Sequence, residues 1–417
     1  MLDHEDAMIA TREIATDLLT PLGAYLRVRG SGEASFLFES VEQGRLGRYS
    51  FLGCGSRLVD LAEAQRLDEP VFGYVGYDCV AGFEPTVPLP DDGPGFPESL
   101  FVVPELVVRF DHARGVAETL VGDGATAAAL LASPQPPTPV GDGVRGELRR
   151  FPDQAEHERR VERAKEHIRQ GDAFQIVVAQ RAERPTSVCA FELYRALRRV
   201  NPSPYLFLLE FPELALVGSS PETHVKCEGR DASLNPIAGS IRPGEGADET
   251  LLASEKDRAE HVMLVDLGRN DLSRVCIPGS VRVERFMYVE HYSHVTHLVS
   301  EVVGELATDM GPFELLRATF PAGTLSGAPK VRAMQIISEL EQYRRGIYGG
   351  AVGYVLPSAG MDTCIAIRTA VLRDGVAYMQ AGGGIVADSD PTEEYHECLN
   401  KLAAVERAIE LAEAEQG

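Results

Sequence analysis

Two acidic helix turns of this 417-residue chain carry carboxylates at a spacing that could hold a cation. Asp257 and Glu260 are three residues apart, and Glu394 and Glu397 repeat that spacing, so each pair shares one face of a predicted helix. Lys401 follows one turn later on the second face. Four carboxylates from two helices would suit Mg²⁺, which prefers oxygen ligands. By spacing alone, a pair of solvated acidic faces is the commoner arrangement.

Three other segments contain residues suited to anion binding or proton transfer. The run Gln380-Ala-Gly-Gly-Gly-Ile385 follows a predicted strand, where glycines let backbone N–H groups approach an anion, although a tight turn explains it equally well. The loop Phe320-Pro-Ala-Gly-Thr-Leu-Ser-Gly-Ala-Pro-Lys330 precedes a predicted helix and could bind an anion or simply cap the helix. His297 could act as a base near neutral pH, although a histidine buried in a core is commoner.

The overall composition excludes several classes of protein. The formal net charge of −23 argues against a nucleic-acid-binding surface, and an anionic substrate would need local positive charge or a bound cation. No stretch approaches the roughly 20 apolar residues of a membrane span, and the acidic N-terminus does not resemble a secretory signal. The seven cysteines are scattered and form no C-x-x-C pair. We therefore expect a cytoplasmic protein without nucleic-acid or membrane partners.

The elements that must position these residues follow from periodicity and from turn residues. A Pro- and Gly-rich stretch at 132–144 predicts an exposed linker, which divides the chain into an N-terminal segment (1–132), a linker (133–150) and a catalytic domain (151–417). Helices are predicted over 153–170, 254–267, 329–341 and 393–413. Strands are predicted over 174–179, 205–211, 214–218, 295–303, 350–356, 364–371 and 376–380. Because no regular βαβ rhythm appears, we predict an α+β fold with largely antiparallel sheets.

Taken together, these segments resemble the chorismate-utilising enzymes, and the matching strings span Gly171 to Ala412 in one order. The resemblance implies that family's fold, with antiparallel β-sheets packed as a sandwich and helices flanking them. A thinner match covers Phe36-Leu-Phe-Glu-Ser40 and Arg48-Tyr-Ser-Phe-Leu-Gly53. The main strings are Asp172-Ala-Phe-Gln-Ile-Val, Asn201-Pro-Ser-Pro-Tyr205, Gly218-Ser-Ser-Pro-Glu222, Pro236-Ile-Ala-Gly239, Glu260-His, Asp266-Leu-Gly-Arg-Asn-Asp271, Phe320 to Lys330, Ile367-Arg-Thr369, Asp388-Ser-Asp-Pro and Asn400-Lys401.

The resemblance also implies a role for each matching site residue. Glu260 and Glu397 would hold Mg²⁺, with Asp257 and Glu394 helping through water, and the metal would bind the ring carboxylate of chorismate. Ser240 stands where the family usually has threonine in a substrate-binding loop. The remaining substrate-binding residues are Tyr348 and Arg368 for the enolpyruvyl carboxylate, and Thr324, Gly383, Gly384 and Lys401 for the ring carboxylate and nearby groups.

Within the family, two positions favour ammonia as the nucleophile. Water-adding relatives have a lysine base where this chain has Gln175, and aminodeoxychorismate-forming relatives have a lysine nucleophile where it has Ala238. The resemblance therefore implies an anthranilate-forming enzyme, with Glu222 as the acid for the leaving C4 hydroxyl and His297 as the base that removes the C2 proton. The alternatives are a relative that forms aminodeoxyisochorismate or aminodeoxychorismate, and a non-catalytic, tryptophan-sensing subunit.

Two further expectations concern an inhibitor and a partner. No segment has the nucleophilic Cys and downstream His-x-Glu of a glutaminase, so we expect a class I glutamine amidotransferase subunit and a hetero-oligomer. Two segments match those that bind feedback-inhibiting tryptophan in relatives, although Asn-Pro and Ser-Pro would also favour a plain turn before a strand. The candidate inhibitor-binding residues are Glu39, Ser40, Asn201, Pro202, Ser203, Pro204 and Tyr205.

Overall fold

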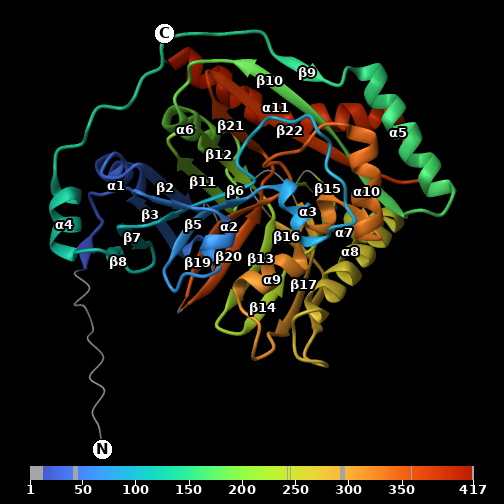
Figure 1. The fold of residues 1–417 in the computed structure, drawn as a ribbon, viewed down its shortest axis with the longest axis horizontal. Helices are drawn as coiled ribbons and strands as arrows, with labels where there is room; N and C mark the ends of the chain where they lie inside the picture. The colour runs from blue at the N-terminus through green and yellow to red at the C-terminus, as the bar shows by residue number, and fades with distance from the viewer. Residues whose placement is uncertain are drawn as a thin grey trace, which may run out of the picture.

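Two large antiparallel sheets pack face to face and helices cover their outer sides (Figure 1). The computed structural model describes residues 13–40, 46–241, 243–244, 246–291, 296–357 and 359–415, with the side chains of Leu46 and Ser240 left aside. This arrangement confirms the predicted α+β fold with a sandwich of antiparallel sheets. None of the helices in these ranges combines the length and apolar composition needed to cross a bilayer.

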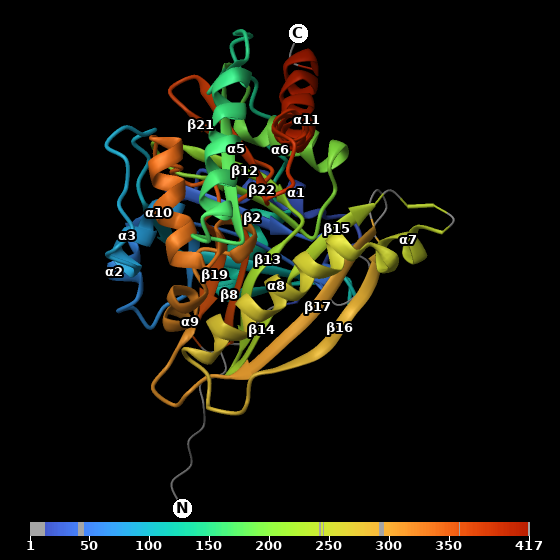
Figure 2. The same cartoon turned by 90° about the vertical axis from the view of Figure 1, so that its right-hand side faces the viewer.

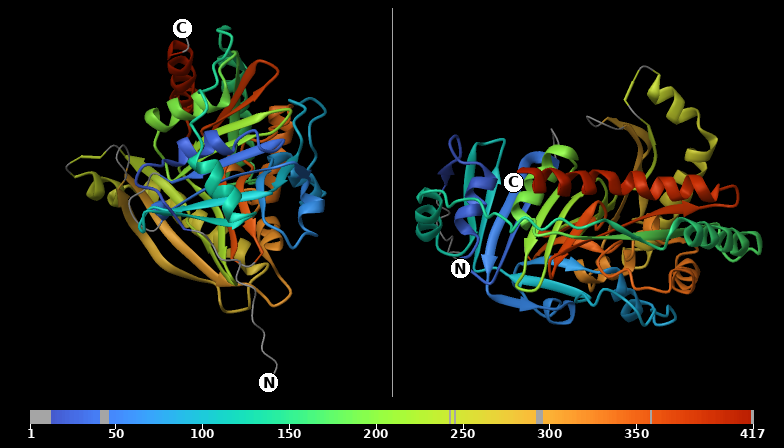
Figure 3. Two further views of the ribbon diagram at one scale, coloured as in Figure 1. Left: turned by 90° about the vertical axis from the view of Figure 1, so that its left-hand side faces the viewer. Right: turned by 90° about the horizontal axis from the view of Figure 1, so that it is seen from above.

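The first sheet, sheet A, packs against the long C-terminal helix α11 (Figure 3). Its strands, in spatial order, are β1 (Ile14–Ala15), β8 (Val116–Val121), β7 (Leu106–Asp111), β3 (Tyr49–Gly55), β2 (Ala34–Glu39), β11 (Tyr205–Glu210), β12 (Ala215–Ser220), β21 (Thr369–Arg373), β22 (Val376–Ile385), β10 (Gln175–Pro185) and β18 (Gly327–Ala328), with β9 (Arg149–Phe151) also paired to β10. The second sheet, sheet B, contains β15 (Ile237–Ile241), β17 (Thr296–Glu305), β14 (Asp231–Leu234), β13 (Thr223–Glu228), β20 (Gly360–Ile365), β19 (Ala351–Leu356), β5 (Val71–Val75), β6 (Ser99–Val103) and β4 (Arg57–Val59), with β16 (Arg282–His291) paired to β17.

The core between the sheets is rich in aromatic rings. Phe36 from sheet A stacks on Phe72 from sheet B with ring centroids 4.0 Å apart, and both side chains are fully buried. Phe207 and Val352 extend the same apolar layer. Because each strand turns alternate side chains inward, this layer holds the two sheets together.

Helices cover the outer faces of both sheets (Figure 2). On sheet A, the apolar side of α11 packs against α6 and the sheet through residues such as Leu402 and Val405. The helices that pack around sheet A are α1 (Pro21–Val28), α4 (Gly124–Ala132), α5 (Gln154–Arg169), α6 (Ala190–Val200), α10 (Lys330–Glu341) and α11 (Pro391–Glu415). Those associated with sheet B are α2 (Leu61–Ala64), α3 (Val80–Phe83), α7 (Ala247–Ala253), α8 (Glu255–Ser273) and α9 (Pro312–Thr319).

Both sheets contain strands from the chain before residues 133–150 and strands from the chain after them. β2 pairs with β11 in sheet A, and β5 pairs with β19 in sheet B. Residues 134–148 themselves contain no helix or strand, apart from an isolated bridge between Arg145 and Thr186. The division of the chain into an N-terminal segment and a catalytic domain stays a prediction.

Helix starts agree well with the sequence predictions. Asp153 caps α5 by accepting a hydrogen bond from the Glu156 backbone N–H at 2.9 Å, and Ser254 caps α8 in the same way from Asp257 at 3.2 Å. Helix α8 continues six residues beyond the predicted end at Leu267.

Three strand predictions were wrong in their boundaries. The strand predicted over 174–179 continues as β10 to Pro185. The segment 364–371, predicted as one strand, is the end of β20 in sheet B and the start of β21 in sheet A. Arg368 lies between them with φ 51°, a left-handed conformation that breaks an extended strand. The strand predicted to stop at Gln380 continues as β22 to Ile385, so the glycine run lies inside the strand and pairs with β10.

Candidate active site

Glu222 lies at the crossing from β12 in sheet A to β13 in sheet B. Its backbone carbonyl accepts a hydrogen bond from Ile365, which fixes the turn, and the Thr324 hydroxyl donates to its Oε1 at 2.9 Å. Burial raises the pKa of Glu222 to about 7, although the Thr324 hydrogen bond and the charges of Lys401 and Arg368 lower it. A carboxyl with such a pKa is partly protonated at neutral pH and can donate a proton.

His297 lies on β17 and is buried. Burial lowers its pKa, the charge of Arg368 lowers it further, and a hydrogen bond to the Gly239 backbone together with Glu290 opposes both effects. The imidazole is therefore neutral at neutral pH and can accept a proton.

Arg368 and Lys401 supply positive charge to the same region. The left-handed backbone of Arg368 follows β20, and its carbonyl accepts a hydrogen bond from the Ser219 N–H at 3.2 Å. Burial lowers the pKa of Arg368, while Tyr348, Glu397 and Glu222 raise it, so these groups surround the guanidinium. An arginine held at positive φ is a typical sign of a functional constraint.

Lys401, on α11, reaches the glycine run. Its ammonium donates to the Gly382 carbonyl at 2.8 Å and pairs with Glu397 at 2.5 Å. Strand β21 pairs with β22 only as far as Met379, so one edge of the glycine run is open to such polar groups.

The three glycines also make room for side chains that crowd this part of β22. A Cβ on Gly382 would lie 3.1 Å from the Tyr348 hydroxyl and 2.8 Å from the Val178 carbonyl oxygen. A Cβ on Gly383 would lie 2.5 Å from Glu394 Oε2, and one on Gly384 would lie 2.1 Å from Gln175 Nε2. Close approach of the neighbouring groups therefore explains the run, a reason that the sequence did not reveal.

Gly384→Ala is expected to lower the rate of the reaction at this site by about 10²-fold, because its methyl group would push Gln175 away from Glu260. The rate measured at saturating substrate checks this. Gly82→Ala is the matched control, since a Cβ at Gly82 meets nothing within 4 Å. A Gly384→Ala rate within twofold of the parent would contradict the expectation.

The four predicted metal ligands lie at the edge of this site. Gln175 Nε2 donates to Glu260 Oε1 at 3.2 Å, and Ser389 donates to Glu394 Oε1 at 2.7 Å, while the buried Oε2 of Glu394 has no hydrogen-bond partner. Burial raises the pKa of both carboxyls. Asp257 lies against Gly239. In the part of the chain that the structure describes, no three His, Cys, Asp or Glu residues converge closely enough to hold an ion.

These donors nevertheless fit a hard divalent cation. All are carboxylates, and the unpartnered Glu394 oxygen points to the space beside Gly383 and near Glu397. The four-carboxylate metal site stays a prediction. So does the role of Ser240, because its side chain lies outside the described part of the structure.

The two segments predicted to bind an inhibitor lie side by side. Glu39 on β2 is directly opposite Leu206 on β11, which places it next to Tyr205. The Glu39 carboxylate accepts a hydrogen bond from Tyr194 at 2.6 Å. The remaining contacts are Asn201 to Ser219, Asn201 to Ser203 at 3.4 Å, and the Tyr205 hydroxyl to Thr223 at 2.9 Å and Asp362 at 3.1 Å. Pro204 borders a groove on sheet B.

Arg345, a residue not predicted from the sequence, packs next to Tyr348. It is almost fully buried and pairs with Glu341 at 2.6 Å, and it donates to the carbonyls of Leu325 and Val177. Its guanidinium lies 5.7 Å from the Tyr348 ring centroid. No motif or periodicity marks this position, because its partners come from three separate elements.

Arg345→Met is expected to destabilise the fold by about 3–5 kcal/mol, because it leaves the Glu341 carboxylate buried without its partner. Urea unfolding followed by circular dichroism measures the change. The double variant Arg345→Met/Glu341→Leu removes both charges and is expected to recover much of the loss. Equal stability of the single and double variants would contradict this account.

The chain is similar in sequence and in fold to known proteins. Residues 32–407 match the family model described as chorismate binding enzyme. An anthranilate synthase component 1 of Thermus thermophilus is 42% identical, covering 95% of this chain and 97% of the relative, and one of Streptomyces coelicolor is 42% identical with 99% and 90% covered. The crystal structure of anthranilate synthase component I from Streptococcus pneumoniae superposes with a TM-score of 0.79 at 34% identity, covering 94% of this chain and 99% of that one.

The chain therefore belongs to the family of chorismate-binding enzymes. Within this family, it is similar over nearly its whole length to anthranilate synthase component 1 proteins. The menaquinone-specific isochorismate synthase of Escherichia coli shares the fold, with a TM-score of 0.76 at 22% identity over 96% of this chain and 94% of that one.

Proposed function

We propose that this chain is the chorismate-converting component of an anthranilate synthase, using ammonia to form anthranilate and pyruvate. The observation that carries the proposal is that Glu222 and His297 both lie near Arg368, whose charge lowers the pKa of each. Glu222 has a raised pKa of about 7, and burial keeps His297 neutral. Near-full-length similarity to proteins named anthranilate synthase component 1 supports the same reaction.

The reaction divides into two steps. Ammonia forms a bond to C2 of the ring while the C4–O bond breaks, and Glu222 gives the leaving hydroxyl a proton so that water departs. The ammonium formed at C2 then releases a proton, which can restore the Glu222 carboxyl. In the second step His297 removes the C2 proton, the C3–O bond breaks and the ring becomes aromatic. The released enolate of pyruvate takes up a proton to become pyruvate, and loss of a proton returns the imidazole to its neutral form.

The charged side chains would position chorismate for these steps. Arg368 and Tyr348 would hold the enolpyruvyl carboxylate, while Lys401 and Thr324 would face the ring carboxylate and nearby groups. Glu260 and Glu397, assisted by Asp257 and Glu394, would hold Mg²⁺, which when bound supplies positive charge to the ring carboxylate. Gln175 has an amide that cannot act as a base, which disfavours water as the nucleophile.

The test mixes purified chain, chorismate, Mg²⁺ and ammonium at alkaline pH and follows anthranilate fluorescence. Appearance of anthranilate, and its loss when a chelator removes the metal, is the expected result. Absence of anthranilate under these conditions would overturn the proposal. Mass spectrometry of the products separates it from an enzyme that stops at aminodeoxyisochorismate.

We also propose a cytoplasmic location, a glutamine amidotransferase partner that supplies ammonia, and feedback inhibition by tryptophan. The neighbouring positions of Glu39 and Tyr205 support an inhibitor site formed by both segments. The chain contains no tryptophan, so the fluorescence of the added amino acid reports its binding directly. Binding that inhibits turnover and is weakened by Ser40→Leu is expected, and tryptophan-insensitive turnover would contradict the inhibitor site.

A further inference from the structure

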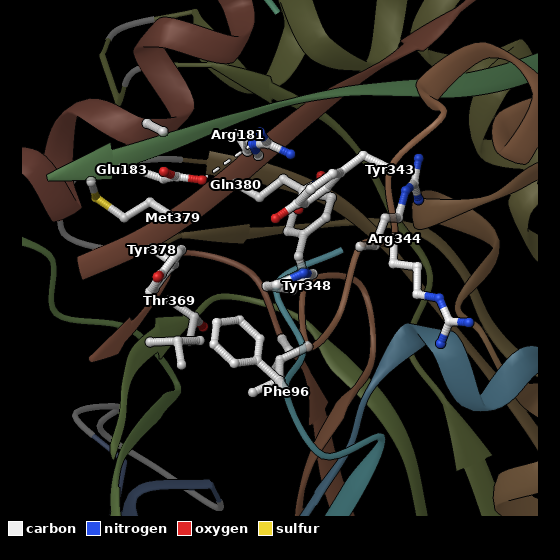
Figure 4. Close-up of a pocket in the computed structure, with 16 residues that line it drawn as sticks. Phe96, Arg181, Glu183, Tyr343, Arg344, Tyr348, Thr369, Tyr378, Met379 and Gln380 are labelled. Carbon is white, nitrogen blue, oxygen red and sulfur yellow. Dashed lines mark ion pairs between the residues drawn. The ribbon is translucent and has the colours of Figure 1, made fainter. Parts of the chain in front are cut away.

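A pocket of about 460 Å³ lies beside the candidate active site, with Tyr348 in its wall (Figure 4). Gln380, Gly382 and Gly384 alternate along β22 and therefore face the same side of the sheet. Gln380 lines the pocket, whereas Gly382 meets the Tyr348 hydroxyl and Gly384 meets Gln175. The pocket and the candidate active site are thus neighbours along one face of a single strand.

Flat aromatic surfaces form much of the pocket wall (Figure 4). Phe96 and Tyr378 meet edge to face, with ring centroids 5.2 Å apart and an interplanar angle of 85°. Tyr343 lies nearby on the loop that follows α10. Such a wall is suited to a planar ring, because aromatic pairs gain energy from offset and edge-on contacts.

Two opposite charges lie together at the top of the pocket in Figure 4. Arg181 and Glu183 are on β10, and their cross-strand partners Gln380 and Tyr378 complete one polar face of the sheet. The Arg181 guanidinium carbon is 3.4 Å from the Tyr343 ring centroid, so stacking fixes its plane.

The Arg181 guanidinium could bind a further hydrogen-bond acceptor. Its buried Nε forms an ion pair with Glu183 Oε1 at 3.3 Å, but about a quarter of the side chain is exposed, so a ligand can reach the rest of the guanidinium. The other two arginines of the lining are occupied, since Arg345 pairs with Glu341 and Arg344 donates to the Pro90 carbonyl. The pocket therefore presents the partly exposed Arg181–Glu183 ion pair, whose guanidinium could also bind a ligand carboxylate and whose carboxylate could also bind a ligand amine.

We propose that this pocket is a second binding site for the aromatic product, a planar ring that carries one carboxylate and one amino group. This inference rests on the proposed function, which forms such a product on the other side of Tyr348. Chorismate fits the pocket less well, because its two carboxylates and non-planar ring match neither the one Arg181–Glu183 ion pair nor the flat walls.

The test measures anthranilate binding to the full chain by fluorescence anisotropy, with saturating chorismate and Mg²⁺ but no ammonia, so that no turnover occurs. The expected result is anthranilate binding that chorismate does not displace, and product inhibition that is noncompetitive with chorismate. Complete displacement by chorismate with purely competitive inhibition would overturn the proposal. Because binding is read without catalysis, its failure is distinct from a failure to form anthranilate.

Two variants locate the site. Arg181→Gln and Tyr378→Ala are each expected to weaken the chorismate-insensitive binding at least tenfold, and Arg407→Gln, an exposed change on α11, is the matched control with no effect. Thermal unfolding checks that each variant is folded, and Arg181→Lys tests whether the planar guanidinium is needed rather than its charge alone. Unchanged binding in both folded pocket variants would place the second site elsewhere and overturn the assignment.

Discussion

Glu222→Gln is expected to lower kcat by about 10²–10⁴-fold, because the amide cannot donate the proton that the leaving hydroxyl needs. The side chain keeps its size, so Thr324 still has an oxygen to which it can donate. The loss is therefore expected in kcat rather than in KM for chorismate. Initial rates of anthranilate formation at saturating chorismate, Mg²⁺ and ammonium measure it.

Thr324→Val provides the matched test of the protonation state. The Thr324 hydrogen bond lowers the pKa of Glu222, so its removal raises that pKa and keeps the carboxyl protonated to higher pH. The proposed acid works only when protonated, so activity falls as pH rises through the pKa. The alkaline limb of kcat, measured at a constant concentration of free ammonia, is expected to move upward. A Glu222→Gln rate within threefold of the parent, or an unmoved limb, would contradict the assignment.

Local features of the fold were predictable from the sequence. The starts of α5 and α8 follow from Asp153 and Ser254, because a capping side chain acts within three residues of itself. The break at Arg368 was not predictable, since the apolar pattern continues through it. Periodicity reports which residues are buried but cannot show that the chain leaves one sheet and enters the other.

The arrangement of the candidate site was even less predictable from the sequence than the strand boundaries. The contact of Glu222 with Thr324 joins residues 102 positions apart, and that of Gln175 with Glu260 joins residues 85 apart. The resemblance to a family named these residues, but neither spacing nor composition could place one against the other. No sequence pattern predicted the stacking of Arg181 on Tyr343, because the residues around Arg181 come from strands and loops that are distant in sequence.

His297→Asn is expected to change the product as well as the rate. The first step, which uses Glu222, should continue, whereas the C2 proton should not be removed, because the amide is not a base. Anthranilate formation is expected to fall by about 10²–10⁴-fold while chorismate is still consumed. Mass spectrometry should then find an amino-substituted ring that retains its enolpyruvyl group. This outcome would separate the two proposed steps within one site.

The control for this prediction is His291→Asn, an exposed histidine at the end of β16 that pairs with Asp248. It should form anthranilate at the parental rate. If His297→Asn instead lost chorismate consumption and anthranilate formation equally, the imidazole would be needed before the second step. Burial lowers the pKa of His297, so the imidazole is already neutral at neutral pH and needs no prior deprotonation. Parental activity should therefore persist toward mildly acidic pH at constant free ammonia, and an acidic limit above the ordinary histidine pKa would argue against its role as the base.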